Sequence, residues 1–197
     1  MSAAPRPRLR GILALLAGLG LVVAAWGVMR IAPSTETVQA AVVVRVDVGE
    51  RGDGRDITAT VFDVVIAESL TDDDAFEPWN GETTGQWIVV EASAGTLVRG
   101  GSLNVELFVD GLTVDGSGRP PLGTSLQTAP LEPGIDVSGW VAFEVPADRP
   151  LPATATIRFA SGIDARLDTV IEVRLDLANA DRVEQFVLPE TEESAIR

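Results

Sequence analysis

The chain has 197 residues, a formal net charge of −14, and no Cys, His, Tyr or Lys. It therefore lacks imidazole and thiolate metal ligands, Ser-His and Cys-His dyads, and the lysine of phosphate-binding loops. Residues 31–197 carry 29 acidic residues and 11 arginines, a formal charge of −18. This charge disfavours nucleic-acid binding and peripheral docking on anionic lipid, because both ligands are themselves anionic.

Nineteen consecutive uncharged residues run from Gly11 to Met29. A helix of this length spans roughly 28 Å, close to the thickness of the hydrocarbon core of a bilayer. Three arginines precede the run, whereas acidic residues dominate after it, so the positive-inside rule places the N-terminus in the cytoplasm. We therefore predict a single-pass cell-membrane protein, held in the lipid bilayer through residues 11–31, with its C-terminal part extracellular.

A cleaved signal peptide is the alternative to this signal anchor. Val38-Gln39-Ala40 has the small-x-Ala pattern of a signal peptidase site. Arg30 and ten further residues separate the apolar run from this site, and the run is longer than the usual signal-peptide core. We favour the retained anchor, and cleavage after Ala40 stays open.

From Val42 onward apolar residues recur with a period of two, which is typical of half-buried strands. The predicted strands are 42–48, 57–66, 86–92, 103–110, 136–145, 154–159, 171–177 and 182–188. Gly and Pro signals separate them, and no segment after the anchor keeps a helical period. The pattern predicts an all-β, immunoglobulin-like antiparallel β-sandwich of seven or eight strands.

These segments define the domain organisation. The predicted parts are a cytoplasmic N-terminus (1–10), a transmembrane helix (11–31), a stalk (32–41), an extracellular β-sandwich domain (42–188) and an acidic tail (189–197). We expect the acidic tail to be frayed, as chain ends commonly are.

Several short motifs resemble one protein family. They are Gly85-Gln86-Trp87-Ile88-Val89-Val90, the Asp115-Gly116 turn, and Leu131-x-Pro133-Gly134 followed by Gly139, Val141, Phe143, Val145 and Pro146. They are similar to segments of exported bacterial immunoglobulin-like domains, telokin-like in fold, common in actinobacteria and of unknown function. The chain departs from the family at Ala92-Ser93-Ala94, where members often carry an Asn-bearing turn. The resemblance implies the fold and an exported location, and it brings no catalytic residue.

Aromatic residues are the first candidates for partner contact. Trp87 lies in an apolar strand and is predicted to be core, as are Phe62 and Phe108. Trp140 falls on the polar face of its strand and Trp79 in a polar loop, so each is a possible partner contact through an exposed indole. The alternative for both tryptophans is cover by a neighbouring loop of their own domain.

The densest acidic cluster is Asp72-Asp73-Asp74 with Glu77. Calcium takes several carboxylate and carbonyl oxygens, but the spaced Asp-x-Asp-x-Asp-Gly pattern is absent. We favour a solvated loop over a metal site. With so much of the usual catalytic inventory missing, we predict that the chain is not an enzyme and holds no cofactor. We predict a non-enzymatic protein-interaction or accessory module of the cell envelope, with an envelope protein as partner; the alternative is a module that binds cell-wall glycan or calcium.

Overall fold

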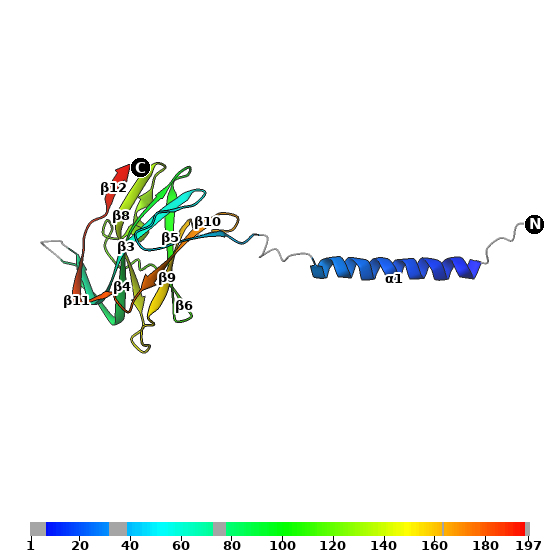
Figure 1. Cartoon of the computed structure of the whole chain (residues 1–197), viewed down its shortest axis with the longest axis horizontal. Helices are drawn as coiled ribbons and strands as arrows, with labels where there is room; N and C mark the ends of the chain where they lie inside the picture. Colours follow the sequence, from blue (N-terminus) through cyan, green and yellow to red (C-terminus); the bar gives the residue numbers. More distant parts are fainter. Residues whose placement is uncertain (1–6, 32–38, 73–77, 163, 196–197) are drawn as a thin grey trace, which may run out of the picture. The chain divides into compact units, whose positions relative to one another are not determined.

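The structure is a computed structural model that describes residues 7–31, 39–72, 78–162 and 164–195. The chain forms two compact units, Met1–Gln39 and Ala40–Arg197. The first contains α1 (Pro7–Ile31), the blue helix of Figure 1, in which Gly11–Arg30 is long and apolar enough to cross a membrane. The predicted apolar N-terminal helix is confirmed. Because such helices serve as anchors or as export signals, the chain is membrane-anchored or exported.

In the described residues, the second unit forms two six-stranded sheets. Sheet A contains, in spatial order, β1 (Val42–Val46), β10 (Thr169–Asp176), β9 (Thr154–Ser161), β5 (Gly101–Val109) and β6 (Leu112–Asp115), with β7 (Pro130–Leu131) beside β5. Sheet B contains β11 (Asp181–Leu188), β3 (Ile57–Asp72), β4 (Gly81–Thr96), β8 (Ile135–Val145) and β12 (Glu192–Ala195), with β2 (Gly52–Asp53) beside β3. One turn of 3₁₀ helix, η1 (Leu126–Thr128), lies between β6 and β7 in the sequence.

The β-sandwich prediction is confirmed, with two differences in detail. The structure describes twelve strands rather than seven or eight, because β2 and β7 have two residues each and β6 and β12 have four. Such short strands are below the length at which a period of two can be recognised. The sheets are also not wholly antiparallel, since β1 pairs with β10 and β11 with β3 in parallel.

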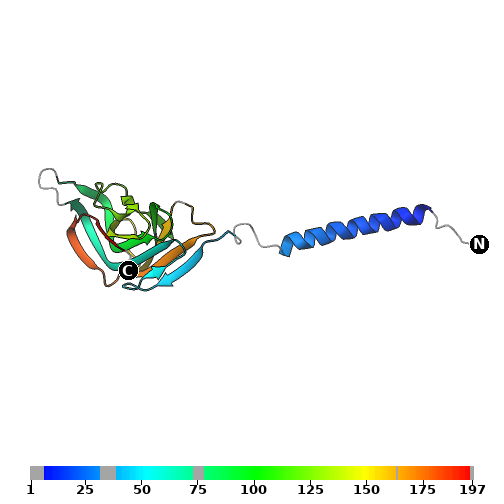
Figure 2. The same ribbon diagram turned by 90° about the horizontal axis from the view of Figure 1, so that it is seen from above.

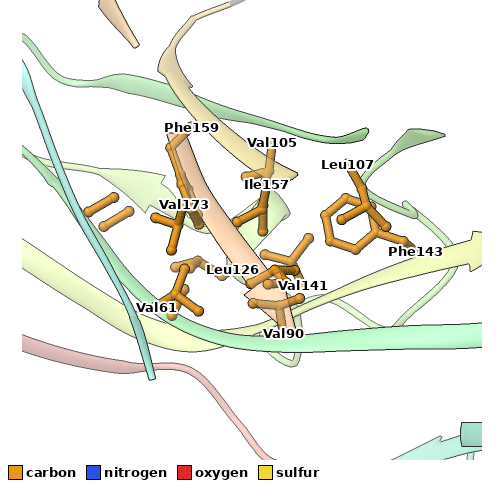
Figure 3. Packing of buried hydrophobic residues seen from close by; sticks show 14 of the residues in the cluster. Val61, Val90, Val105, Leu107, Leu126, Val141, Phe143, Ile157, Phe159 and Val173 are labelled. Atoms are coloured by element: carbon orange, nitrogen blue, oxygen red, sulfur yellow. The ribbon is translucent and has the colours of Figure 1, made fainter. Parts of the chain in front are cut away.

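The main core fills the space between the two sheets. Figure 3 shows Val90 and Val141 of sheet B pointing toward Ile157 and Val173 of sheet A, with Leu126 of η1 close by. All five side chains are fully buried. Every buried member of this core lies within residues 57–177, so the helix contributes nothing to it. We therefore expect residues 40–197 to fold without residues 1–39.

A second, smaller core lies on the outer face of sheet B. It is aromatic-rich, and we call it the aromatic core. Its members are Ala67, Leu70, Trp87, Val89, Ala142 and Leu188, with Trp79, Trp140 and Phe186 packed against them. This second core explains why β3 and β4 are apolar on both faces.

The C-terminal segment closes the aromatic core. β11 and β12 lie at opposite edges of sheet B, yet only residues 189–191 connect them. The ring centroids of Trp140 and Phe186 are 4.6 Å apart, although β3 and β4 separate their strands. Three strand spacings in a flat sheet would be roughly 14 Å, so sheet B is curled around the aromatic core. The bent ribbon of β3 in Figure 2 follows this curl.

The acidic tail differs from its prediction. Residues 192–195 form β12, which pairs antiparallel with β8 and is the red strand beside it in Figure 1. The Thr191 N–H donates to the carbonyl of Gly123 at 2.7 Å. The segment from 189 to 195 therefore belongs to the sandwich, and backbone pairing holds it where side chains give no apolar signal.

Candidate functional site

The two predicted contact residues, Trp79 and Trp140, lie at the border of the aromatic core. Both are half-buried. The Trp140 ring packs on Phe186 at an interplanar angle of 57°. The Trp79 indole lies over Gly81, where an added Cβ would come within 2.6 Å of Cη2, and the backbone N–H of Trp79 donates to Asp72 Oδ1 at 2.8 Å. Each indole is thus covered in part by its own domain, and contact of the rest with a partner stays a prediction.

Trp87 is a core residue, as predicted. Its side chain is fully buried, and its Nε1 donates to the carbonyl of Gly81 at 2.8 Å. The Arg119 guanidinium lies 5.3 Å from the centre of the Trp87 ring and donates to Glu144 Oε2 at 2.9 Å. The Thr83 hydroxyl first, and Arg119 with it, hold the pKa of Glu144 below its ordinary value against the effect of burial. These contacts fasten the Arg119 loop over the indole, which is a structural role.

The acidic cluster lies mostly outside the described residues, since only Asp72 of its four members is described. The Asp72 carboxylate accepts the hydrogen bond from the backbone N–H of Trp79. Elsewhere in the described part of the chain, no group of three or more acidic residues is placed to hold a metal ion. The calcium alternative therefore stays a prediction about residues 73–77.

The core prediction for two phenylalanines is wrong. Phe62 is 48% exposed because a β-bulge separates Val61 from Asp63 in the pairing with β4. Val61 and Val64 both enter the main core, so the extra residue turns Phe62 outward. Phe108 is half-buried on the outer face of sheet A, where the Arg158 guanidinium lies 4.5 Å from its ring centre.

The exposed Phe62 ring borders a groove of about 310 Å³ on the outer face of sheet B. We call it the hydroxyl groove; its lining residues are Arg51, Thr60, Phe62, Ser93, Asp136, Ser138, Ser194 and Ala195. Thr60 pairs with Ser93, and Ser93 with Ser138, in the registers of β3, β4 and β8. Directly paired side chains lie roughly 5 Å apart, so the three hydroxyls form one row across the sheet.

An ion pair forms one wall of the hydroxyl groove. Arg51 Nη1 donates to Asp136 Oδ2 at 2.8 Å, and the buried Thr58 hydroxyl donates to Asp136 Oδ1 at 3.2 Å. The hydrogen bond to Asp136, opposed by burial, raises the pKa of Arg51. Both charges are thereby fixed in place. The groove offers an aromatic ring, hydroxyls, a guanidinium and a carboxylate, which suits binding of a polar ligand rather than nucleophilic chemistry.

The second candidate surface is the free edge of β11. This strand has eight residues and pairs with β3 on one side, while no described strand pairs with its other side. Val183 and Val187 are 37% and 48% exposed along it. The other edge strands, β1, β6 and β12, have only five, four and four residues. Since proteins commonly shorten or block their sheet edges, an eight-residue edge without proline is the most suitable place for another strand to add.

No family model matches the chain, and no curated protein matches it. Among solved structures, an uncharacterised β-sandwich protein from Clostridium difficile has a TM-score of 0.47 and 11% identity, over 74% of this chain and 100% of that one. The yjhA protein from Bacillus subtilis has a TM-score of 0.45 and 14% identity, over 64% and 98%. The secreted protein MPT63 from Mycobacterium tuberculosis has a TM-score of 0.43 and 13% identity, over 70% and 99%. Because all three TM-scores are below 0.5, the fold assignment rests on the sheet topology described above.

Proposed function

We propose that the chain is a non-enzymatic protein-interaction module of the cell envelope. Its helix α1 anchors it in the membrane with the N-terminus in the cytoplasm, and its sandwich lies outside the cell. The observation that supports the interaction most strongly is the free edge of β11. We propose that an extended segment of an envelope protein adds to this edge as a further strand.

Strand addition draws its affinity from main-chain hydrogen bonds and its specificity from side chains beside the edge. A cavity of about 210 Å³ lies beside β11 on its paired side, lined by residues 182–184 of β11, residues 66–68 of β3 and Gln86 of β4, so the free edge itself stays open. Two exposed valines among charged residues give this edge both an apolar contact and a polar rim, as protein interfaces have. The absence of His, Cys and Lys from the sequence supports a non-catalytic role.

Site-specific crosslinking in membranes tests this proposal. A photo-crosslinking residue at the exposed position Gln185 is expected to give one discrete adduct, and the same residue at Leu122, which is 88% exposed, is expected to give none. Val187→Lys places a charge on the edge and is expected to remove the adduct while leaving the unfolding midpoint unchanged, because the side chain is half exposed. Equal adducts from Gln185 and Leu122, or an adduct that survives Val187→Lys, would contradict strand addition.

A second candidate function is binding of cell-wall glycan, and the hydroxyl groove favours it. The Phe62 ring lies beside the Arg51–Asp136 ion pair and the row of three hydroxyls. An apolar ring face with hydrogen-bonding groups around it is complementary to a sugar, which has apolar C–H faces and polar hydroxyls. In this candidate Phe62, rather than Trp79 or Trp140, is the stacking residue.

Calorimetry with soluble wall fragments separates the two functions. A stacking contact is worth about 0.5–1.5 kcal/mol, so Phe62→Ala is expected to weaken glycan binding by about two- to twelve-fold. Phe108→Ala, on the opposite sheet, is the matched control and is expected to have no effect. An absence of binding by the unchanged protein would exclude the glycan function.

We also propose membership of the exported, telokin-like immunoglobulin family that the motifs resemble. The structure gives these motif residues definite structural roles. Trp87 is buried in the aromatic core, Gly134 has φ +83 in the turn before β8, and Gly139 leaves room for Thr191. Such roles support a shared fold, and they bring no shared activity.

A further inference from the structure

One end of the sandwich lies where the chain enters β1. The Val42 N–H donates to the carbonyl of Asp168 at 2.8 Å, and the Arg55 N–H donates to Thr169 Oγ1 at 3.1 Å. We call this end the entry pole; it surrounds a cavity of about 340 Å³ and comprises Arg55, Val98, Arg99, Arg166, Leu167 and Asp168.

Chain length restricts the distance between the entry pole and the end of α1. Ten residues, 32–41, separate Ile31 from Val42. Fully extended, they reach roughly 35 Å. A domain of the size of Ala40–Arg197 is roughly 40 Å across. If α1 spans a bilayer, as the proposed function requires, the linker length keeps the entry pole within roughly 35 Å of the membrane surface.

The entry pole exposes apolar side chains to solvent. Val98 is 69% exposed and Leu167 is 61% exposed, and Val42 and Leu97 beside them are also exposed. Leu167 has φ +61, a left-handed conformation that bulky residues rarely adopt. A leucine held in a strained turn with its side chain in water is unfavourable on both counts, which points to a function for the exposed side chain.

Hydrogen bonds hold the backbone of Val98 and Arg99 in place. The buried Asp56 carboxylate accepts hydrogen bonds from the N–H groups of Val98 (2.8 Å) and Arg99 (3.1 Å) and from Arg99 Nε (3.1 Å). Burial raises the pKa of Asp56, but these three donors outweigh burial and lower it overall. Arg99 Nη2 also reaches Asp168 Oδ2 at 3.3 Å. The network fixes the Val98 loop beside the Leu167 loop.

The charge balance of the entry pole differs from that of residues 31–197 taken together. Its three arginines are balanced by three acids close by, Asp56, Asp164 and Asp168, whereas residues 31–197 carry −18. Asp164 is occupied by Arg166, whose Nη2 lies 2.6 Å from Oδ2. The repulsion from anionic lipid that the whole sequence predicts is thus absent at this pole, where arginine and exposed apolar side chains occur together. This combination is typical of surfaces that lie in the headgroup region of a membrane.

We propose that the entry pole docks on the bilayer that holds α1. Val98 and Leu167 enter the headgroup region, and Arg55 and Arg166 lie at the level of the lipid phosphates. Docking gives the sandwich a fixed orientation on the membrane, with its opposite end presented away from the lipid. This inference rests on the membrane anchorage in the proposed function.

Spin labelling of the full chain tests the docking. Because the chain has no cysteine, each variant carries one nitroxide at one known position. The labelled variants are Val98→Cys and Leu167→Cys at the entry pole, Leu122→Cys as the control, and Leu19→Cys within α1. Leu122 is a suitable control because it is 88% exposed and lies near Asp72, at the end of β3 opposite Asp56. The proteins are reconstituted in vesicles of phosphatidylcholine and phosphatidylglycerol, and collisions with oxygen and with a water-soluble nickel complex are measured.

The expected result is a severalfold loss of nickel collisions and a gain of oxygen collisions at positions 98 and 167, with neither change at position 122. Arg166→Glu is expected to return the label at position 98 toward the values of the control. The docking would be overturned if the labels at positions 98 and 122 had equal nickel collisions while the label at position 19 was in lipid. That result would leave the anchor intact. A label at position 19 that is open to nickel would overturn the anchor, and the docking with it.

Discussion

Replacement of Leu188 tests the structural role of the C-terminal segment. Leu188 is 1% exposed and belongs to the aromatic core, where it packs under the crossing from β11 to β12. Truncation of a buried leucine to alanine costs about 2–4 kcal/mol, from lost burial and from the cavity that remains. For a domain of this size we take a urea m-value of about 2 kcal/mol/M, so Leu188→Ala is expected to lower the urea midpoint by about 1–2 M.

The assay is urea unfolding of residues 40–197, followed by fluorescence of the tryptophans. Val187→Ala is the matched control, since the neighbouring side chain is 48% exposed and its loss is expected to cost less than about 1 kcal/mol. Equal losses for both variants, or an unchanged midpoint for Leu188→Ala, would refute the contribution of the aromatic core to stability.

Three further predictions concern single positions. Asp56→Ala is expected to cost about 2–4 kcal/mol at pH 7, because the buried carboxylate accepts three hydrogen bonds. The pKa of Asp56 is below its ordinary value of 3.8. The stability that the ionised carboxylate contributes is therefore present above about pH 4 and is lost as the pH falls through the lowered pKa. Urea unfolding is expected to show a smaller difference in free energy of unfolding between the unchanged protein and Asp56→Ala at pH 3 than at pH 7. Gly85→Ala is expected to lower the free energy of unfolding by about 1–3 kcal/mol, because the added Cβ would lie 2.1 Å from the carbonyl oxygen of Val145. Gly101→Ala is the control: the space around Gly101 is open, so its free energy of unfolding is expected to stay within about 0.5 kcal/mol of the unchanged protein in the same assay. Phe62→Ala is expected to leave the urea midpoint within about 1 kcal/mol of the unchanged protein, because its side chain is 48% exposed; a larger loss would place the ring in the core after all.

Sequence periodicity identified the strands that have one face in the core and one in water. In β5 the buried Leu103, Val105 and Leu107 alternate with partly exposed neighbours, as the pattern predicts. The same period cannot reveal β12, whose residues Glu192–Ala195 are all exposed and are held by backbone pairing with β8. It also fails at Phe62, because one extra residue in a bulge reverses which side chains face inward.

The hydroxyl groove and the free edge of β11 could not be predicted from the sequence. Thr60, Ser93 and Ser138 are far apart in the chain, and only the registers of β3, β4 and β8 bring their hydroxyls into one row. The predicted strand 86–92 ended one residue before Ser93, so the sequence pattern did not include this hydroxyl. The free edge of β11 depends on which strand pairs with which, and that is a property of the whole fold.

The entry pole shows the same dependence on tertiary structure. The formal charge of −18 is a sum over residues 31–197 and does not show how charge is distributed on the surface. The entry pole has balanced charges and exposed apolar side chains despite this sum. Arg99 and Asp56 are 43 residues apart and join there only because strands β3 and β4 are antiparallel neighbours. The docking proposed above therefore depends on local surface composition rather than on the net charge.

Both the proposed function and the membrane docking require α1 to hold the sandwich outside the cell, and labelling of one introduced cysteine tests this topology. Leu122→Cys gives the full chain one thiol at a position that is 88% exposed on the sandwich. Intact cells are treated with a membrane-impermeant maleimide, and the labelled fraction is compared with that after lysis. We expect full labelling of membrane-bound protein in intact cells; labelling only after lysis would show that the sandwich is not outside the cell.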